Sequence, residues 1–101
     1  MKSYMLGVDI GTTSTKAVLF DRQGNAVKQS SIEYPLNVPE PGAAEQDPDE
    51  ILEAVKQSIR TVMKESSIDP KALKVVSFSA AMHSLIAVDQ EGQPLTPSIT
   101  W

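Results

Sequence analysis

Residues 4–21 read YMLGVDIGTTSTKAVLFD. The nearly continuous apolar run over residues 4–9 is bounded by Gly11 and is typical of a β-strand that is buried on both faces. A second apolar run follows after a short polar link and consists of Ala17, Val18, Leu19 and Phe20. The two runs predict a β-hairpin whose turn is formed by residues 11–14.

A third strand and a loop are expected next. The turn over residues 21–24 leads into residues 26–34, where apolar side chains are scattered among polar ones. This pattern predicts a more exposed strand at an edge of the sheet. Residues 35–42 hold three prolines and a glycine, which predicts a loop.

A helix is predicted to start at Asp47. Asp47 can cap the helix, Pro48 suits its first position, and Glu50 stands in a capping-box arrangement with the cap. Out to about Glu65, apolar residues recur at the spacing of one helix face: Ile51, Leu52, Val55, Ile59, Val62 and Met63. This periodicity predicts an amphipathic helix that covers the sheet.

The rest of the chain predicts a return to the sheet and a second hairpin. Residues 71–73 form a short turn, residues 75–79 a strand, residues 81–84 a polar link, and residues 85–89 another strand. The turn Asp89-Gln90-Glu91-Gly92 echoes Asp21-Arg22-Gln23-Gly24, with Asp first and Gly fourth as type I turns prefer. The echo suggests two similar hairpins.

Composition limits the class of protein. The chain has 101 residues, a formal net charge of −4 and no cysteine. This length fits one domain, and the lack of cysteine excludes a disulfide framework and a thiolate site. No apolar run is long enough to span a membrane and no signal peptide is evident, so a cytoplasmic protein without a membrane partner is expected.

The acidic charge is concentrated at the predicted helix start. Five of the thirteen acidic residues lie there: Glu45, Asp47, Asp49, Glu50 and Glu53. Acidic side chains are favourable at the positive end of a helix, so the cluster indicates capping rather than a partner. The remaining chain is close to neutral, and no basic stripe predicts nucleic-acid binding.

Residues 9–16 are the most informative for chemistry. Asp9 ends a predicted strand and is followed by a glycine turn with four hydroxyl residues and by Lys16. Backbone N–H groups and hydroxyls of such a turn can hold phosphate oxygens, and a carboxylate can hold hydrated Mg²⁺. Neither a Walker motif nor G-x-G-x-x-G is present. An ordinary hairpin turn rich in small residues is the alternative.

Several segments together resemble the FGGY family of carbohydrate kinases, in the actin-like ATPase superfamily. In the family's order and spacing they are Asp9 to Lys16 with Phe20-Asp21, Glu45 to Pro48, Ser77 to His83, Asp89 to Gly92, Pro94-Leu95 and Ile99 to Trp101. The resemblance implies part of an α/β, ribonuclease-H-like (actin-like ATPase) fold. We expect the amino-terminal part of the first kinase domain, with a mixed sheet, an antiparallel meander and a crossover helix.

The resemblance also implies a site for ATP and Mg²⁺. Asp9 would help to bind Mg²⁺, and the phosphate end would be lined by Gly11, Thr12, Thr13 and Ser14. Lys16 would meet a phosphate oxygen, with a solvated strand lysine as the alternative.

The resemblance also implies that three other residues line the sugar-binding site. Met82 and His83 match a Met-His pair that contacts the sugar in xylulose-kinase-like members, although a lone histidine is more often structural. Trp101 falls where family members place an aromatic ring against the sugar, and a buried core tryptophan is nearly as consistent. Glu45 is ambiguous between the sugar cleft and helix capping, with the structural role favoured.

The neighbours of the Met-His pair bear on the substrate. Ala81 and Ser84 stand where xylulose kinases usually have Gln and Gly, and this departure fits an acid sugar better than a pentulose. Within the family, residues 79–84 (SAAMHS) and residues 3–11 (SYMLGVDIG) most resemble members that act on gluconate. That resemblance implies transfer of the γ-phosphoryl group of ATP to the 6-hydroxyl of D-gluconate. Another kinase of the family, acting on xylulose, glycerol or another sugar, and a non-catalytic actin-like nucleotide-binding module are the alternatives.

The chain ends on the apolar stretch Ile99-Thr100-Trp101, which looks cut rather than finished. No catalytic residue is assigned, because the family's general base and adenine-binding domain are expected beyond residue 101. The 101 residues alone are therefore expected to have negligible kinase activity. They are also expected to form homo-oligomers through strand edges that truncation exposes.

Overall fold

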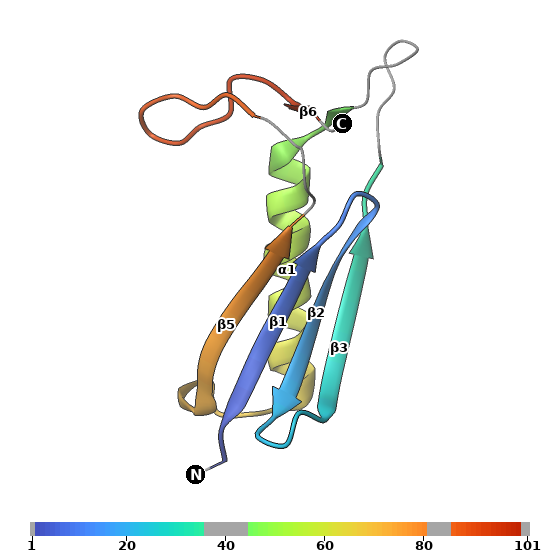
Figure 1. Cartoon of the computed structure of the whole chain (residues 1–101), viewed down its shortest axis with the longest axis vertical. Coiled ribbons are helices and arrows are strands. Elements are labelled where there is room, and N and C mark those ends of the chain that lie inside the picture. The colour runs from blue at the N-terminus through green and yellow to red at the C-terminus, as the bar shows by residue number, and fades with distance from the viewer. Residues whose placement is uncertain (1, 36–44, 81–85, 100–101) are drawn as a thin grey trace.

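The computed structural model describes residues 2–35, 45–80 and 86–99. The elements are β1 (Tyr4–Ile10), β2 (Ser14–Asp21), β3 (Ala26–Glu33), β4 (Glu45–Gln46), α1 (Pro48–Ser66), the 3₁₀ turn η1 (Pro70–Ala72), β5 (Leu73–Ala80) and β6 (Ser98–Ile99). The main sheet has the order β3-β2-β1-β5, and α1 lies across one face (Figure 1). β1, β2 and β3 form an antiparallel meander, and β5 returns parallel to β1. The predicted mixed sheet, edge strand and crossover helix are confirmed.

The core lies between α1 and the sheet. Its buried side chains are Leu6, Val8, Ala17, Leu19, Val55 and Val62. On the strands these residues alternate in sequence, because successive side chains point to opposite faces. α1 packs mainly against β2 and β3. Within the described residues the sheet therefore has one covered face and one open face.

The start of α1 follows the prediction at Asp47. Its carboxylate accepts a hydrogen bond of 3.0 Å from the N–H group of Asp49, and Pro48 takes the first helical position. Glu50 makes no reciprocal bond to Asp47 among the described residues, so the predicted capping box is not formed. The helix ends at Ser66, after which Ser67 adopts a left-handed conformation with φ 57°. In the part of the chain that is described, no helix is long and apolar enough to span a membrane.

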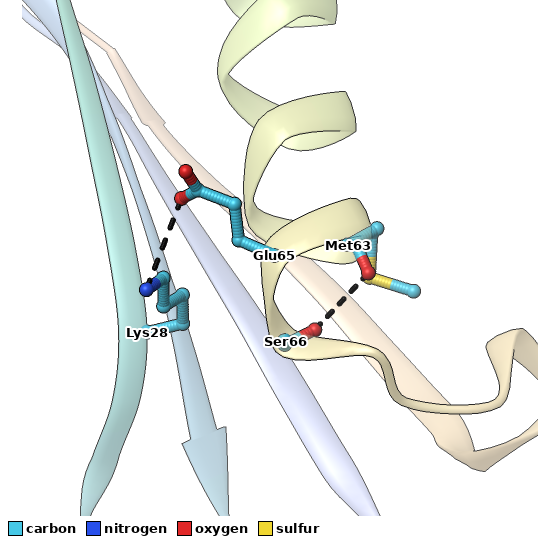
Figure 2. Close-up of polar contacts among 4 residues, drawn as sticks. All are labelled: Lys28, Met63, Glu65 and Ser66. Atoms are coloured by element: carbon cyan, nitrogen blue, oxygen red, sulfur yellow. Dashed lines mark hydrogen bonds and ion pairs between the residues drawn. The ribbon is translucent and has the colours of Figure 1, made fainter.

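Two polar contacts lie at the last turn of α1 (Figure 2). The Lys28 ammonium group of β3 is 3.9 Å from the Glu65 carboxylate, and the Ser66 hydroxyl donates to the Met63 carbonyl oxygen at 3.2 Å. Both members of the ion pair are about half exposed, so the pair contributes only about 0.2–1 kcal/mol to stability.

Two burial predictions are wrong. β1 is buried on one face only, because no described element covers the open face; there, Met5 and Asp9 are exposed. Leu52 is 51% exposed. It is displaced by about 100° from Ile51 around the helix and leaves the row of side chains that faces the sheet. Ser58, a polar residue, takes a core position instead.

The predicted strand over residues 85–89 is also wrong where the structure describes it. Leu85 lies outside the described residues, and residues 86–89 form only an isolated bridge between Val88 and Pro94. Proline has no N–H group, so Pro94 cannot extend a strand ladder. The short strands β4 and β6, which pair antiparallel, were not predicted.

The echo between the two Asp-Gly turns is confirmed at the level of hydrogen bonds. The glycine N–H group donates to the aspartate carbonyl oxygen at 3.1 Å in the turn of Gly24 and at 3.0 Å in the turn of Gly92. Each aspartate carboxylate, of Asp21 and of Asp89, also accepts from two backbone N–H groups further along its turn. Only the first turn joins two ladder strands, so the second is not a full hairpin.

Candidate functional site

Three polar side chains lie side by side on the open face of the sheet. Asp9 of β1 is paired with Lys16 of β2 and, on its other side, with Ser79 of β5. All three are exposed, and residues paired on neighbouring strands point to the same face. They line a pocket of about 280 Å³ together with, among others, Phe20 and Ser77. The sheet thus places a carboxylate, an ammonium group and hydroxyls around one hollow.

The turn between β1 and β2 is tight. The Gly11 N–H group donates to the Ser14 carbonyl oxygen at 2.8 Å. A Cβ atom on Gly11 would lie only 3.1 Å from that oxygen, so a side chain there would crowd the turn. Thr12 is half-buried and Thr13 is exposed. The turn is therefore closed by the hydrogen bond from Gly11, and Thr13 is open to solvent.

The other carbonyl oxygens of the turn accept from buried groups. The Tyr34 hydroxyl donates to the Gly11 carbonyl oxygen, and the Tyr34 backbone N–H group donates to that of Thr13 at 3.0 Å. The Gln46 side-chain amide donates to the Thr12 carbonyl oxygen. Within the described residues, the N–H groups of Thr12 and Thr13 donate no hydrogen bond. The turn therefore offers donors, which is the arrangement that binds anions.

A second pocket lies at the carboxyl ends of β1 and β5. It has a volume of about 200 Å³ and is lined by Ile10, Gly11, Gln46, Pro48, Ile51, Ala80, Ile86 and Ser98. Ser98 is held there by the pairing of β6 with β4. Because Gly11 lines this pocket, the turn borders a hollow on the side of Gln46 as well.

The residues predicted to bind phosphate and Mg²⁺ lie together on the β1–β2 hairpin: Asp9, Gly11, Thr12, Thr13, Ser14 and Lys16. Among the residues that the structure describes, no group of three or more His, Cys, Asp or Glu could hold a metal ion. Asp9 therefore offers a single carboxylate. One carboxylate fits Mg²⁺ that arrives with a nucleotide, because such an ion takes its other ligands from water and phosphate.

The predicted sugar-binding residues Met82, His83 and Trp101 lie outside the described residues. Glu45 belongs to β4, where it pairs with Ile99, and the helix cap is Asp47. Glu45 thus has a structural place, as a strand residue rather than as a cap.

Three residues near the site were not predicted from the sequence: Tyr34, Gln46 and Ser79. Tyr34 lies 23 residues from Gly11, and Gln46 lies 34 residues from Thr12, so only the fold brings them to the turn. A weak signal existed for Gln46 and Ser79, because each lies inside a segment that carries the family resemblance. Tyr34 had none.

Known proteins similar to this chain are carbohydrate kinases. The profile of the "FGGY family of carbohydrate kinases, N-terminal domain" matches residues 4–101. The chain is 52% identical over 101 residues to a gluconokinase from Bacillus subtilis and 38% identical over 101 residues to a xylulose kinase from Staphylococcus epidermidis. These matches cover 100% of this chain and 19% and 20% of the two relatives. The chain thus spans about a fifth of the length of the relatives it matches.

Solved structures show the same fold. A gluconate kinase from Lactobacillus acidophilus superposes with a TM-score of 0.90 at 42% identity, over 100% of this chain and 20% of that chain. A ligand-bound xylulose kinase from the same organism superposes with a TM-score of 0.86 at 42% identity, over 98% of this chain and 20% of that chain. The sheet and helix are therefore part of the predicted ribonuclease-H-like, actin-like ATPase fold.

Proposed function

This chain belongs to the FGGY family of carbohydrate kinases, and on that basis we propose that it is the amino-terminal part of the first domain of a cytoplasmic gluconate kinase. The proposed reaction is transfer of the γ-phosphoryl group of ATP to the 6-hydroxyl of D-gluconate. The observation that carries the choice of gluconate is the 52% identity to the Bacillus subtilis gluconokinase across the whole chain. The identity to the xylulose kinase from Staphylococcus epidermidis is 38%.

The β1–β2 hairpin supports the nucleotide part of the proposal. The N–H groups of Thr12 and Thr13 would donate to phosphate oxygens, with the Ser14 hydroxyl nearby. Lys16 would neutralise part of the phosphate charge, and Asp9 would hold Mg²⁺ directly or through water. When bound, Mg²⁺ lowers the negative charge that an attacking hydroxyl meets at the γ-phosphate.

Phosphoryl transfer asks little covalent chemistry of the protein and depends on positioning and charge neutralisation. The hairpin would therefore act by fixing the phosphate end of ATP. We place the general base and the adenine site beyond residue 101, and no catalytic residue is assigned within this chain. The 101-residue chain alone would accordingly have negligible kinase activity.

The sugar would contact Met82, His83 and Trp101. The pocket of about 200 Å³ at the end of β5 supports this placement, because its lining residue Ala80 directly precedes the segment that carries Met82 and His83. Ala81 and Ser84, in place of the Gln and Gly usual in xylulose kinases, favour an acid sugar.

Xylulose is the second candidate substrate. The ligand-bound xylulose kinase from Lactobacillus acidophilus is 42% identical to this chain, and so is the gluconate kinase from the same organism. Identity to these two solved structures does not separate the two sugars.

A substrate panel on the full-length protein tests the proposal. ADP release is measured with ATP, Mg²⁺ and either D-gluconate, D-xylulose or glycerol, and the product is identified by mass spectrometry. We expect kcat/KM for D-gluconate to exceed that for the other two by at least about tenfold, a difference that pocket contacts readily supply. A preference for D-xylulose would select the second candidate. Nucleotide binding without transfer to any sugar would indicate a non-catalytic module.

A further inference from the structure

We propose that Tyr34 and Gln46 are positioning residues for the nucleotide phosphates. They hold carbonyl oxygens of the turn over residues 11–14 and thereby aim the N–H groups of Thr12 and Thr13 at the ligand. The inference rests on the proposed function, because it takes a phosphate group as the ligand of the turn. It requires no contact between either residue and the nucleotide.

The geometry of the peptide bond links the held oxygens to the free donors. The carbonyl group of Gly11 and the N–H group of Thr12 belong to one peptide unit, and so do the carbonyl group of Thr12 and the N–H group of Thr13. No described peptide bond is cis, and in a trans unit the two groups point in opposite directions. The Tyr34 hydroxyl therefore orients the Thr12 N–H group, and the Gln46 amide orients the Thr13 N–H group.

Both positioning side chains are anchored in the protein interior. Tyr34 is 7% exposed and Gln46 is 4% exposed. They approach the turn from separate segments, since Tyr34 follows β3 and Gln46 lies in β4 before the helix cap. A buried donor without an acceptor is costly, so both side chains resist any turn conformation that withdraws the two oxygens.

A third side chain, that of Thr15, extends this network. The Thr15 hydroxyl is fully buried and lies 3.2 Å from the Tyr34 hydroxyl. A carbonyl oxygen can only accept, so the single phenol proton of Tyr34 goes to Gly11. The Thr15 hydroxyl thus donates to Tyr34, and the Tyr34 hydroxyl donates to the Gly11 carbonyl oxygen. Loss of either hydrogen bond loosens the first peptide unit of the turn.

The test uses Tyr34→Phe and Gln46→Met in the full-length protein. Each change keeps the bulk of the side chain and removes the donor. We expect the KM for ATP and the dissociation constant for MgADP to rise about tenfold in each variant, the effect of losing roughly one hydrogen bond to phosphate. In Tyr34→Phe the KM for the sugar should stay within about twofold, because Tyr34 does not line the pocket of about 200 Å³ that supports the sugar placement, whereas Gln46 does.

Matched controls make the same chemical changes elsewhere. Tyr4→Phe alters the chain's other tyrosine, and Gln29→Met alters an exposed glutamine of β3. Both should bind ATP and MgADP as the wild type does. Thr15→Val should weaken MgADP binding, whereas Thr15→Ser, which keeps the hydroxyl, should restore it. If Tyr34→Phe or Gln46→Met does not fold, the Thr15 pair carries the test.

The outcomes separate this inference from the proposed function. A wild type that phosphorylates a sugar, with variants whose KM for ATP and MgADP affinity are unchanged, overturns the inference alone. Lower melting temperatures with unchanged nucleotide constants also overturn it, because they indicate a purely structural role. A wild type that binds MgADP but transfers phosphate to no sugar refutes the proposed function; weaker MgADP binding by the variants then still supports the inference. A wild type that does not bind MgADP refutes both.

Discussion

Asp9 of β1 and Lys16 of β2 are direct cross-strand neighbours on the open face of the sheet, yet no ion pair joins them. Both side chains are exposed. Under the proposed function, the carboxylate would serve Mg²⁺ and the ammonium group would serve a phosphate oxygen.

Replacing Asp9 by Asn should remove most activity of the full-length protein. Asn keeps the size of the side chain but removes the negative charge proposed to hold Mg²⁺. We expect kcat/KM for ATP to fall by about 10²-fold, the scale seen when one charge-stabilising group is lost. The dependence of the rate on Mg²⁺ concentration should shift to higher concentrations. Asp49→Asn, which changes an exposed aspartate of α1, is the control and should be active.

Replacing Lys16 by Met should act on ATP binding rather than on the sugar. The loss of one positive charge near phosphate should raise the KM for ATP by about three- to tenfold. Because salt screens exposed charges, the variant should also show a weaker dependence of this KM on ionic strength. Lys56→Met on the exposed side of α1 should change neither property. An unaltered KM in Lys16→Met would identify Lys16 as an ordinary solvated strand lysine.

Replacing Ser58 by Ala should stabilise the protein. The Ser58 hydroxyl is fully buried in α1 and has no hydrogen-bond partner within the described part of the chain, so it was desolvated without compensation. Its removal should raise the free energy of unfolding by about 1 kcal/mol, measured by chemical denaturation. Ser66→Ala is the matched control, because the Ser66 hydroxyl donates to Met63 (Figure 2) and its loss should not stabilise. A destabilised Ser58→Ala variant would contradict the prediction.

The turn of Asp21 should make stability depend on pH. The backbone N–H group of Asn25, with further bonds from the Asn25 side chain and Gln23, holds the pKa of Asp21 below its ordinary value of 3.8 despite partial desolvation. A carboxyl whose pKa is lower in the folded chain stabilises the fold above its ordinary pKa, and this contribution disappears as the pH falls through the folded-state value.

The measurement compares the wild type with Asp21→Asn from neutral pH to below the ordinary aspartate pKa. The wild type should be the more stable protein at neutral pH, and the difference should narrow in acid. Gln23→Ala changes the same turn without a titrating group, so its stability difference from the wild type should not vary with pH. A constant difference for Asp21→Asn would contradict the prediction.

The 101-residue chain, expressed alone, should self-associate through β5. β5 is the last strand of its sheet in the described part of the chain, and Val76 and Phe78 form an exposed apolar patch on one face of it. Unpaired edges and apolar patches favour association. Light scattering should give a mass that rises with concentration, and Phe78→Lys, which adds a charge to the patch, should lower it. A concentration-independent monomer would contradict this.

Local patterns predicted most of the fold. The hairpin of β1 and β2, the cap at Asp47 and the turns at Gly24 and Gly92 all depend on neighbours within a few residues, and all are observed. Burial was predicted less well. Leu52 is apolar and was therefore predicted to face the sheet. Its exposure depends on the rotation of α1 about its own axis relative to the sheet, which only the packed structure determines.

The candidate site was likewise predicted only where its residues are close together in the sequence. Residues 9–16 were identified because a carboxylate, a glycine turn and hydroxyls are contiguous in sequence. Tyr34 and Gln46 were not, since hydrogen bonds across 23 and 34 residues leave no pattern in a single sequence. Ser79 lies beside Asp9 only because of the register in which β5 pairs with β1, and no local motif specifies that register.

The two Asp-Gly turns close with their own aspartate and glycine and use only backbone atoms of the residues between them. Arg22, Gln23, Gln90 and Glu91 are exposed and contribute no side-chain atom to the closure. The fold therefore places little constraint on the identity of these four side chains, and any residue with a backbone N–H group can replace Gln23 or Glu91. Differences among relatives at these positions should record the time since divergence and not a change of substrate.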